Sequence, residues 1–315
     1  MSRKRICIII GLREDKTSLI VNFSRQVKRP AGGRAAKGVY FLLFLAASLG
    51  LTRTAAAGRP TELKGETIAA FDRYVLLTNE RNDAELKLGT TPLWFDTLPA
   101  PRRSGTYTAL QGGDVEIHQL QTLDAGRPIV CPGGMIHHWV AAVFIPRAKL
   151  QDVLAVLEDY DHQSTYYAPD VERSKIEARD GDHFRVFLRF RRHKVITVVL
   201  DTVHDIHYFQ DAAGRAHSRS SAIRIAEVEN AGEGDEREKP PGDDGGFLWR
   251  METWWRMREG DGGVYVQSEV VSLTRDIPTG LAWMIGPFVT SIPKDTLLFT
   301  MQATRNAVEA RLQRK

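Results

Sequence analysis

Apolar residues recur at helical spacing in three segments of the chain, at 61–88, at 148–160 and from Lys294 onward. Residues three and four apart lie on one face of a helix, so each segment is expected to bury one side. The stripes are Ile68, Phe71, Val75 and Leu76; then Leu150, Val153, Leu154 and Leu157; then Leu297, Met301, Thr304, Val308 and Leu312. After the first helix, prolines at Pro92, Pro99 and Pro101 are expected to break the chain.

The last helix is expected to begin at Ser291-Ile292-Pro293. Serine is a favoured N-cap residue, and proline is tolerated in the first helical turn. The preceding apolar stretch, 279–290, is interrupted by Gly286-Pro287, which argues against an earlier start.

Alternating apolar and polar residues predict strands in the rest of the chain. Strands are expected between Tyr107 and Phe144, with 136–145 apolar enough to be buried, and about five more over 171–273. Turn sequences such as Arg179-Asp180-Gly181-Asp182 and Asp261-Gly262-Gly263 join consecutive strands, which favours antiparallel pairing. The pattern therefore predicts an α+β fold, in which the helices pack on one face of an antiparallel sheet.

A signal peptide is the interpretation we favour for the start of the chain. Residues 39–51 are apolar and uncharged, and they are too few to span a bilayer, which takes about 20 residues. Arg34 and Lys37 precede this run, and Ala55-Ala56-Ala57 follows it with the small residues of a cleavage site. A short buried helix is the alternative. We expect an exported protein, periplasmic or secreted, whose mature chain begins near Gly58.

Removal of the leader would reverse the charge of the protein. The 315-residue chain has a net charge of +4, but residues 1–57 contain eleven Lys and Arg and only two acids. Residues 58–315 then keep 32 basic and 37 acidic residues, a net charge of −5, which argues against a nucleic-acid partner. Of the two cysteines, Cys7 lies in the leader, so Cys131 would remain without a disulfide partner.

Three short motifs resemble the START-like (SRPBCC) superfamily, which includes polyketide cyclases and lipid-transfer domains. They are Phe144-Ile145-Pro146-Arg147-Ala148 leading into a helix that ends Leu157-Glu158-Asp159-Tyr160-Asp161, then Tyr167-Ala168-Pro169-Asp170-Val171, and Leu273-Thr274-Arg275-Asp276-Ile277-Pro278 before the final helix. The resemblance covers roughly 110–312. It implies a helix-grip architecture, in which a curved antiparallel sheet wraps around the long C-terminal helix and leaves an apolar cavity between them.

This resemblance divides the chain into three parts. Residues 1–57 are the leader and signal peptide, 58–106 an N-terminal helical extension, and 107–315 the START-like ligand-binding domain. The extension departs from the superfamily pattern, and so does 231–246, an acidic, glycine-rich segment that we interpret as an exposed loop.

The histidines and acids do not form a convincing metal or catalytic site. They occur as His137-His138, as Asp201, His204, Asp205 and His207, and as Asp159, Asp161 and His162. Adjacent strand residues point to opposite faces, so His137 and His138 cannot share an ion without a bulge. Asp205 and His207 do share a face, but a polar outer strand face is the favoured interpretation. We assign no metal, no cofactor and no catalytic residue.

Aromatic residues and methionines provide the candidate ligand site. Trp249, Met251 and Trp255 are expected on one face of the strand 247–258, and apolar residues of other elements are expected to face the same layer. Ligand pockets are mostly apolar with a few polar groups, whereas plain core packing is the alternative for each residue. The predicted ligand-binding residues are Trp139, Phe184, Leu188, Trp249, Met251, Trp255, Trp283 and Met301.

These observations favour an exported carrier or binding protein for a hydrophobic small molecule or lipid. Such a protein could also make transient contact with a membrane. The first alternative is a cyclase or hydratase-type enzyme that uses the same cavity, with Arg224, Glu252 or Tyr208 acting on the substrate. The second is a scaffold protein that binds no ligand. The oligomeric state stays open.

Overall fold

The computed structural model describes residues 63–88, 92–193, 197–211, 213–240, 243–276 and 282–314, with the backbone alone over 282–290. All of them belong to one unit of the chain, 55–315. The predicted leader, 1–57, lies outside the described residues. Among those described, no helix combines the length and the apolar character needed to cross a membrane.

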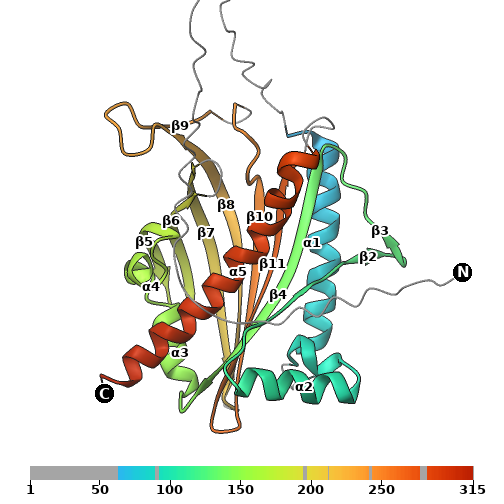
Figure 1. Ribbon diagram of the computed structural model, residues 1–315, viewed down its shortest axis with the longest axis vertical. Coiled ribbons are helices and arrows are strands. Elements are labelled where there is room, and N and C mark those ends of the chain that lie inside the picture. Colours follow the sequence, from blue (N-terminus) through green and yellow to red (C-terminus); the bar gives the residue numbers. More distant parts are fainter. Residues whose placement is uncertain are drawn as a thin grey trace, which may run out of the picture. The chain divides into compact units, whose positions relative to one another are not determined.

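A large antiparallel sheet forms the centre of this unit (Figure 1). Its strands follow the order β1 (Glu116–Gln119), β4 (Gly134–Pro146), β11 (Gly263–Arg275), β10 (Arg250–Gly260), β8 (Arg215–Glu229), β7 (Thr197–Asp211), β6 (His183–His193) and β5 (Val171–Asp180). The short β9 (Arg237–Glu238) pairs with β8, and β2 (Leu123–Asp124) pairs with β3 (Arg127–Pro128) as a separate ribbon. Most neighbours in the sheet are also neighbours in the chain, as turn-linked strands require.

The helices pack against both faces of the sheet. They are α1 (Gly65–Leu86), η1 (Trp94–Thr97), α2 (Ala100–Gln111), α3 (Leu150–Leu157), η2 (Tyr160–His162), α4 (Gln163–Tyr166) and α5 (Ala282–Leu312). We call the face that packs against α3 and α5 the inner face, and the face that packs against α1, η1 and α2 the outer face. Figure 1 shows α5 crossing the sheet obliquely.

Strand alternation separates two sets of core residues. In β11, Val264 and Val266 pack in the inner cluster with Met301 of α5, whereas Tyr265 between them packs in an outer cluster with Phe95. A second outer cluster places Phe71, Tyr74 and Val75 of α1 against Trp254, Val271 and Leu273. The predicted α+β helix-grip fold is confirmed, with helices on the outer face in addition.

Two helix boundaries differ from the sequence-based expectation. Residues 100–111 form α2, where we expected a broken chain and then a strand from Tyr107. Pro101 lies in the first turn of α2, where a missing N–H costs no hydrogen bond. The last helix begins at Ala282 and includes Gly286-Pro287, so the expected start at Ser291 was wrong.

The buried side of α1 is more polar than its predicted stripe. Phe71 and Val75 are buried as expected, but Leu76 is 48% exposed. The buried set also includes Thr67, Tyr74, Thr78 and Asn82. The acidic segment 231–246 is likewise less irregular than expected, because β9 lies within it and pairs with β8.

Candidate functional site

The inner face, beneath α5, brings together most of the predicted ligand-binding residues. Phe184 and Met301 are fully buried, and Leu188 is buried at 8% exposure. Trp139 and Trp255 are partly buried and pack against the same cluster. They come from β4, β6, β10 and α5, so the curvature of the sheet places them around one layer.

Trp249 does not belong to this layer. It precedes β10 and packs in the outer cluster with Phe71 of α1, so the expectation that it shares a face with Trp255 was wrong. Its indole Nε1 donates to Asp244 Oδ1 at 3.0 Å, which holds the ring at the strand entrance instead of on the alternating strand face. Met251 of β10 is half-buried, and the side chain of Trp283 lies outside the described residues.

Three buried polar atoms on the described strands of the inner face make no hydrogen bond. They are Trp139 Nε1 on β4, Ser268 Oγ on β11 and Ser218 Oγ on β8, and the first two lie close together. The register pairs Trp139 with Val270 and Ala141 with Ser268, so the two side chains are diagonal neighbours on one face. Buried polar groups almost always have partners, and an unpaired one costs about 1–3 kcal/mol. A ligand with a hydrogen-bonding group would supply the missing partner.

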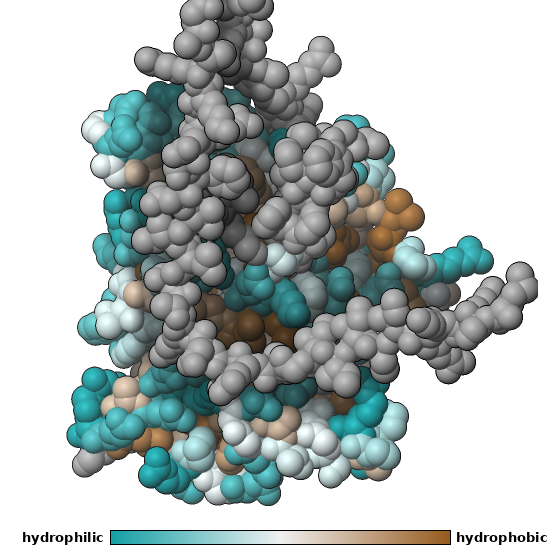
Figure 2. Space-filling model, viewed as in Figure 1, coloured by the Kyte–Doolittle hydropathy of each residue, from teal (hydrophilic) through white to brown (hydrophobic). Residues whose placement is uncertain are grey.

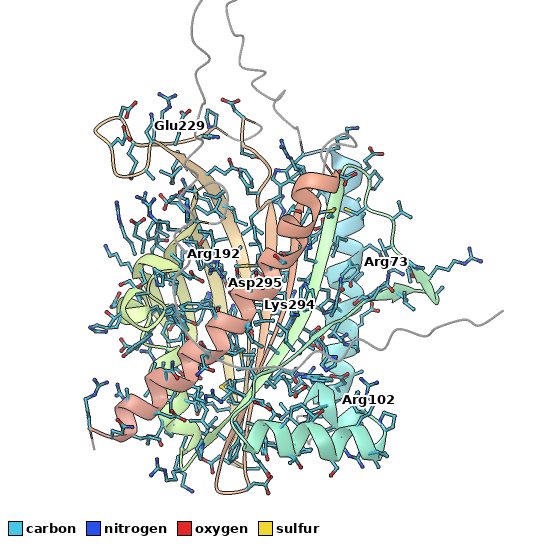
Figure 3. The ribbon with its side chains drawn as sticks, viewed as in Figure 1. Arg73, Arg102, Arg192, Glu229, Lys294 and Asp295 are labelled. Atoms are coloured by element: carbon cyan, nitrogen blue, oxygen red, sulfur yellow. The ribbon has the colours of Figure 1, made fainter. Side chains whose placement is uncertain are left out.

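The N-terminal half of α5 adds charge near this pair. Lys294 Nζ lies 5.9 Å from the centre of the Trp139 ring. At the other edge, Arg192 Nη2 donates to Thr296 Oγ1 of α5 at 2.8 Å, and Arg192 Nη1 donates to Asp170 Oδ1 at 2.8 Å. Burial raises the pKa of Asp170, and Arg192 only partly offsets this. Figure 3 labels Lys294 and Asp295 on α5 and Arg192 on β6, which its hydrogen bond to Thr296 joins to the helix.

His204 lies on the inner face of β7, with no carboxylate beside it. Burial lowers the pKa of its imidazole to about 4, so the ring is neutral at pH 7. The single proton of Thr202 Oγ1 is donated to the Leu188 carbonyl at 3.0 Å, so His204 Nε2, 2.9 Å from that hydroxyl, must be the donor. The lone pair of Nδ1 then faces Ser220 Oγ at 3.4 Å.

Of the residues named for an enzymatic alternative, only Tyr208 is on the inner face. Its hydroxyl lies 2.7 Å from that of Tyr160, and burial raises the pKa of both phenols. Glu252 accepts from Ser221 at 2.7 Å and lies on the outer side of β10, while Arg224 pairs with Glu238 of β9. The sequence could not distinguish these three, because the strand faces depend on the register.

Two open hollows flank α5 on its solvent side and share Phe299 and Gln302. One, of about 800 Å³, lies between α5 and the start of β1, where Val115 and Leu298 line it. The other, of about 360 Å³, lies between α5 and α4, against Tyr166 and Ala307. Neither is lined by a residue of β10, where we expected the cavity wall. Figure 2 shows hydrophobic side chains near the centre of the face that α5 crosses, with hydrophilic ones around them.

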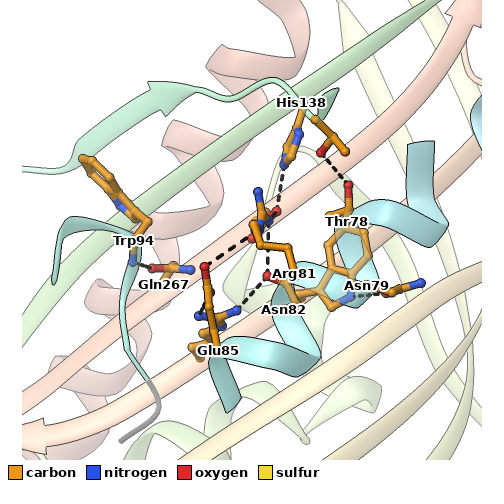
Figure 4. Close-up of polar contacts among 12 residues, drawn as sticks. Thr78, Asn79, Arg81, Asn82, Glu85, Trp94, His138 and Gln267 are labelled. Atoms are coloured by element: carbon orange, nitrogen blue, oxygen red, sulfur yellow. Dashed lines mark hydrogen bonds and ion pairs between the residues drawn. The ribbon is translucent and has the colours of Figure 1, made fainter. Parts of the chain in front are cut away.

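On the outer face, a buried polar network fastens α1 to the sheet (Figure 4). Glu269 of β11 accepts from Arg81 and lies 2.8 Å from His138 Nε2. Burial alone would raise the pKa of Glu269, but the hydrogen bond from His138 and the charge of Arg81 outweigh it and lower that pKa. Arg256 donates to Asn82 at 2.7 Å and to Glu85 at 2.6 Å. These contacts join α1 to β4, β10 and β11, whereas Asn82 Nδ2 in the same network makes no hydrogen bond.

Comparisons with known proteins find only distant structural similarity. No protein-family profile matches the chain, and no curated protein matches it either. It is similar to solved structures that include the STAR-related lipid transfer protein from Xanthomonas axonopodis, with 19% identity, a TM-score of 0.39, and coverage of 61% of this chain and 98% of that one. Another is the Zhui aromatase/cyclase from Streptomyces sp. R1128, with 13% identity, a TM-score of 0.37, and coverage of 56% and 96%. A third is a START superfamily protein from Mycobacterium smegmatis, with 14% identity, a TM-score of 0.36, and coverage of 55% and 97%. The arrangement itself, a large antiparallel sheet with a long C-terminal helix across it, is seen directly in the structure.

Sequence reasoning missed Ser268 and His204 as inner-face polar groups. Ser268 lies in β11, where Val264, Val266 and Val270 alternate with polar residues. Ser268 has the same spacing as these valines, so the sequence could have placed it on their face of the strand. In the same way, His204 is two and four residues before Ile206 and Tyr208 in β7, so the alternation places it on the face that those two residues share.

Proposed function

We propose that this protein binds a hydrophobic small molecule or lipid between the inner face and α5, and that it carries the molecule without transforming it. The unpaired Trp139 Nε1 and Ser268 Oγ, diagonal neighbours beside the apolar residues of the inner cluster, are the observation that supports this most directly. Removal of the ligand's apolar surface from water contributes about 25 cal/mol per Å². Trp139 Nε1 and Ser268 Oγ would orient the ligand by hydrogen bonds to its polar end.

Lys294 favours a ligand whose polar end is an acceptor or an anion. Its ammonium lies 5.9 Å from the centre of the Trp139 ring, and this positive charge attracts a negatively charged group to the same place. A fatty acid would fit Trp139 Nε1, Ser268 Oγ and the charge of Lys294, with its carboxylate at Trp139 and Ser268. Its hydrocarbon chain would lie along the apolar residues of the inner face. The export predicted from 39–57 places the carrier in the periplasm or outside the cell, where it could take up its ligand by transient contact with a membrane.

Native mass spectrometry of the protein purified from its own host tests the proposal directly. We expect a co-purified apolar molecule, and we expect the emptied protein to bind members of a panel of fatty acids, quinones and sterols. The variant Trp139→Phe keeps a six-membered aromatic ring and removes the pyrrole ring with its N–H. It should weaken binding by at least about fivefold, because the lost hydrogen bond alone is equivalent to about 1 kcal/mol.

Trp94→Phe is the matched control. Trp94 Nε1 is also buried without a partner, but Trp94 packs on the outer side near Phe95 and His118. This variant should leave ligand affinity unchanged. No co-purified ligand and no binding across the panel would favour the scaffold alternative, whereas equal losses in both variants would move the ligand away from the inner face.

An enzyme that uses the same site is the second candidate, and His204 favours it. A neutral imidazole with a lone pair aimed at Ser220 is a group that can accept a proton from a bound substrate. His204→Gln should then abolish turnover of a polyketide-like substrate and preserve its binding. Unchanged turnover in this variant would exclude His204 as the base.

A further inference from the structure

Two histidines and one aspartate converge on the outer face of β6 and β7. His183 Nε2 lies 2.9 Å from Asp205 Oδ1, and His207 Nε2 lies 3.1 Å from the same oxygen. The two imidazole rings are stacked, with centroids 3.9 Å apart and planes at 11°. One ligand atom from each residue lies within 4.8 Å of the others.

The pairing of the two strands produces this convergence. His183 is opposite His207, and Asp205 is two residues away from His207 on the same face. Phe184 and Ile206 belong to the inner cluster, so their neighbours His183, Asp205 and His207 point to the outer side. The sequence places Asp205 and His207 together, but the third ligand comes from another strand and appears only once the register is known.

We propose that His183, Asp205 and His207 form a binding site for a divalent transition-metal ion, zinc in particular. Two imidazole nitrogens and a carboxylate oxygen are ligands that zinc accepts, with a water as the fourth. Magnesium and calcium prefer oxygen ligands alone, so the two histidines select against them.

The spacing of the ligand atoms fits such an ion. With bonds of about 2.0–2.1 Å, a tetrahedral zinc holds its ligand atoms about 3.3 Å apart. The N–O separations of 2.9 and 3.1 Å are slightly shorter, so small side-chain rotations make room for the ion. Each neutral ring binds through the Nε2 lone pair and keeps its proton on Nδ1.

The surroundings leave the site open to an ion from solution. The side chains of His183, Asp205 and His207 are 41%, 26% and 50% exposed. Two cations lie next to it in the register, Arg185 opposite Asp205 and Arg219 opposite His207. Arg219 is 3.8 Å from Glu252, and Asp180 lies opposite His183, so negative charge is also close. The site is on the other side of the sheet from the proposed ligand layer and is independent of it.

Metal titration of the full chain, produced without an affinity tag and stripped with a chelator, tests the proposal. We expect one Zn²⁺ per chain by isothermal titration calorimetry. Co²⁺ in its place should give the visible absorption of a tetrahedral ion. His183→Ala and His207→Ala should each weaken zinc binding by about tenfold or more, because an open site has only three protein ligands.

His162→Ala is the matched control. His162 is an exposed histidine whose Nδ1 lies 2.7 Å from Asp159 Oδ1, but it has no second imidazole beside it. This variant should bind zinc as the unchanged protein does. Absence of stoichiometric zinc in the unchanged protein would overturn the proposal. Zinc binding that persists in both His183→Ala and His207→Ala would also overturn it. If that binding is then lost in Cys131→Ser, the ion is bound by the Cys131 thiol.

Discussion

Burial keeps the imidazole of His204 uncharged, while that of His138 has a carboxylate beside it. Both rings are buried, at 4% and 1% exposure. Burial lowers the pKa of His138 as well, and Glu269, 2.8 Å from its Nε2, offsets only part of this shift. The hydrogen-bonding neighbours of His204 in the described part of the chain are the hydroxyls of Thr202 and Ser220, and these do not compensate a positive charge.

The stability of the protein should therefore depend on pH through His204. Its pKa is about 4 in the folded state against an ordinary 6.5, so the unfolded chain binds more protons between these values. The contribution is present in full above pH 6.5 and is lost as the pH falls toward 4. It corresponds to roughly 3 kcal/mol. Urea unfolding at several pH values measures it.

His204→Gln isolates this term from the other titrating groups. Glutamine keeps a donor for Thr202 and does not titrate, so the fall in unfolding free energy from pH 6.5 to 4 should be smaller in the variant than in the unchanged protein. Identical slopes would mean that His204 is accessible to protons in the folded state.

At the scale of elements, α1 depends on a buried carboxylate that belongs to the sheet. The side chain of Glu269 is 3% exposed, and its cationic partner Arg81 comes from α1. A buried charge that loses its partner destabilises a protein strongly, whereas an exposed ion pair contributes little. The α1 helix has one pair of each kind, since Arg81 pairs with the buried Glu269 and Arg73 pairs with the exposed Asp124.

Arg81→Met should lower the unfolding free energy by about 3 kcal/mol, because it leaves Glu269 with His138 alone. Arg73→Met, also on α1, removes an exposed pair in which Arg73 lies 2.7 Å from Asp124, and it should leave the unfolding free energy nearly unchanged. Chemical denaturation of the two variants measures the contrast. Equal losses would show that Glu269 is solvated in solution.

The α5 helix allows a similar contrast between two introduced carboxylates. Met301 is fully buried against the inner face, so Met301→Asp should cost on the order of 4 kcal/mol. Asn306 is exposed on the same helix, so Asn306→Asp should leave the melting temperature within about two degrees. Similar melting temperatures for the two variants would mean that α5 does not pack on the sheet.

Elements with a strong apolar period were predictable from the sequence, and those held by polar contacts were not. The strands over 171–273 and the stripe Leu297, Met301 and Val308 follow directly from spacing. The buried side of α1 includes Asn82 and Thr78, whose partners Arg256 and Thr122 are distant in sequence. Spacing also misplaced Trp249, because the regular alternation of β10 begins only at Arg250.

In the described unit as a whole, α3 and α5 pack on the inner face of the sheet, and α1, η1 and α2 cover part of its outer face. The resemblance of short motifs to the START-like superfamily was enough to predict α5 across a curved antiparallel sheet. It could not predict that α1, η1 and α2 pack on the outer face, because residues 58–106 have no counterpart in that resemblance. The outer clusters involve β4, β10 and β11, and the outer side of β6 and β7 keeps exposed residues such as Arg185 and His207.

Export should change the charge of the whole molecule in a way that can be measured without a ligand. Cleavage after Ala57 would remove a segment with eleven basic and two acidic residues and convert a net charge of +4 into −5. The exported form should therefore bind an anion exchanger at pH 7.5 and give an N-terminal sequence that starts near Gly58. A form that keeps its leader, made by Ala55→Leu and Ala57→Leu together, should stay with the cells and bind a cation exchanger instead. Recovery of intact Met1 in the exported fraction would remove the signal-peptide interpretation, and with it the periplasmic or extracellular setting of the proposed carrier.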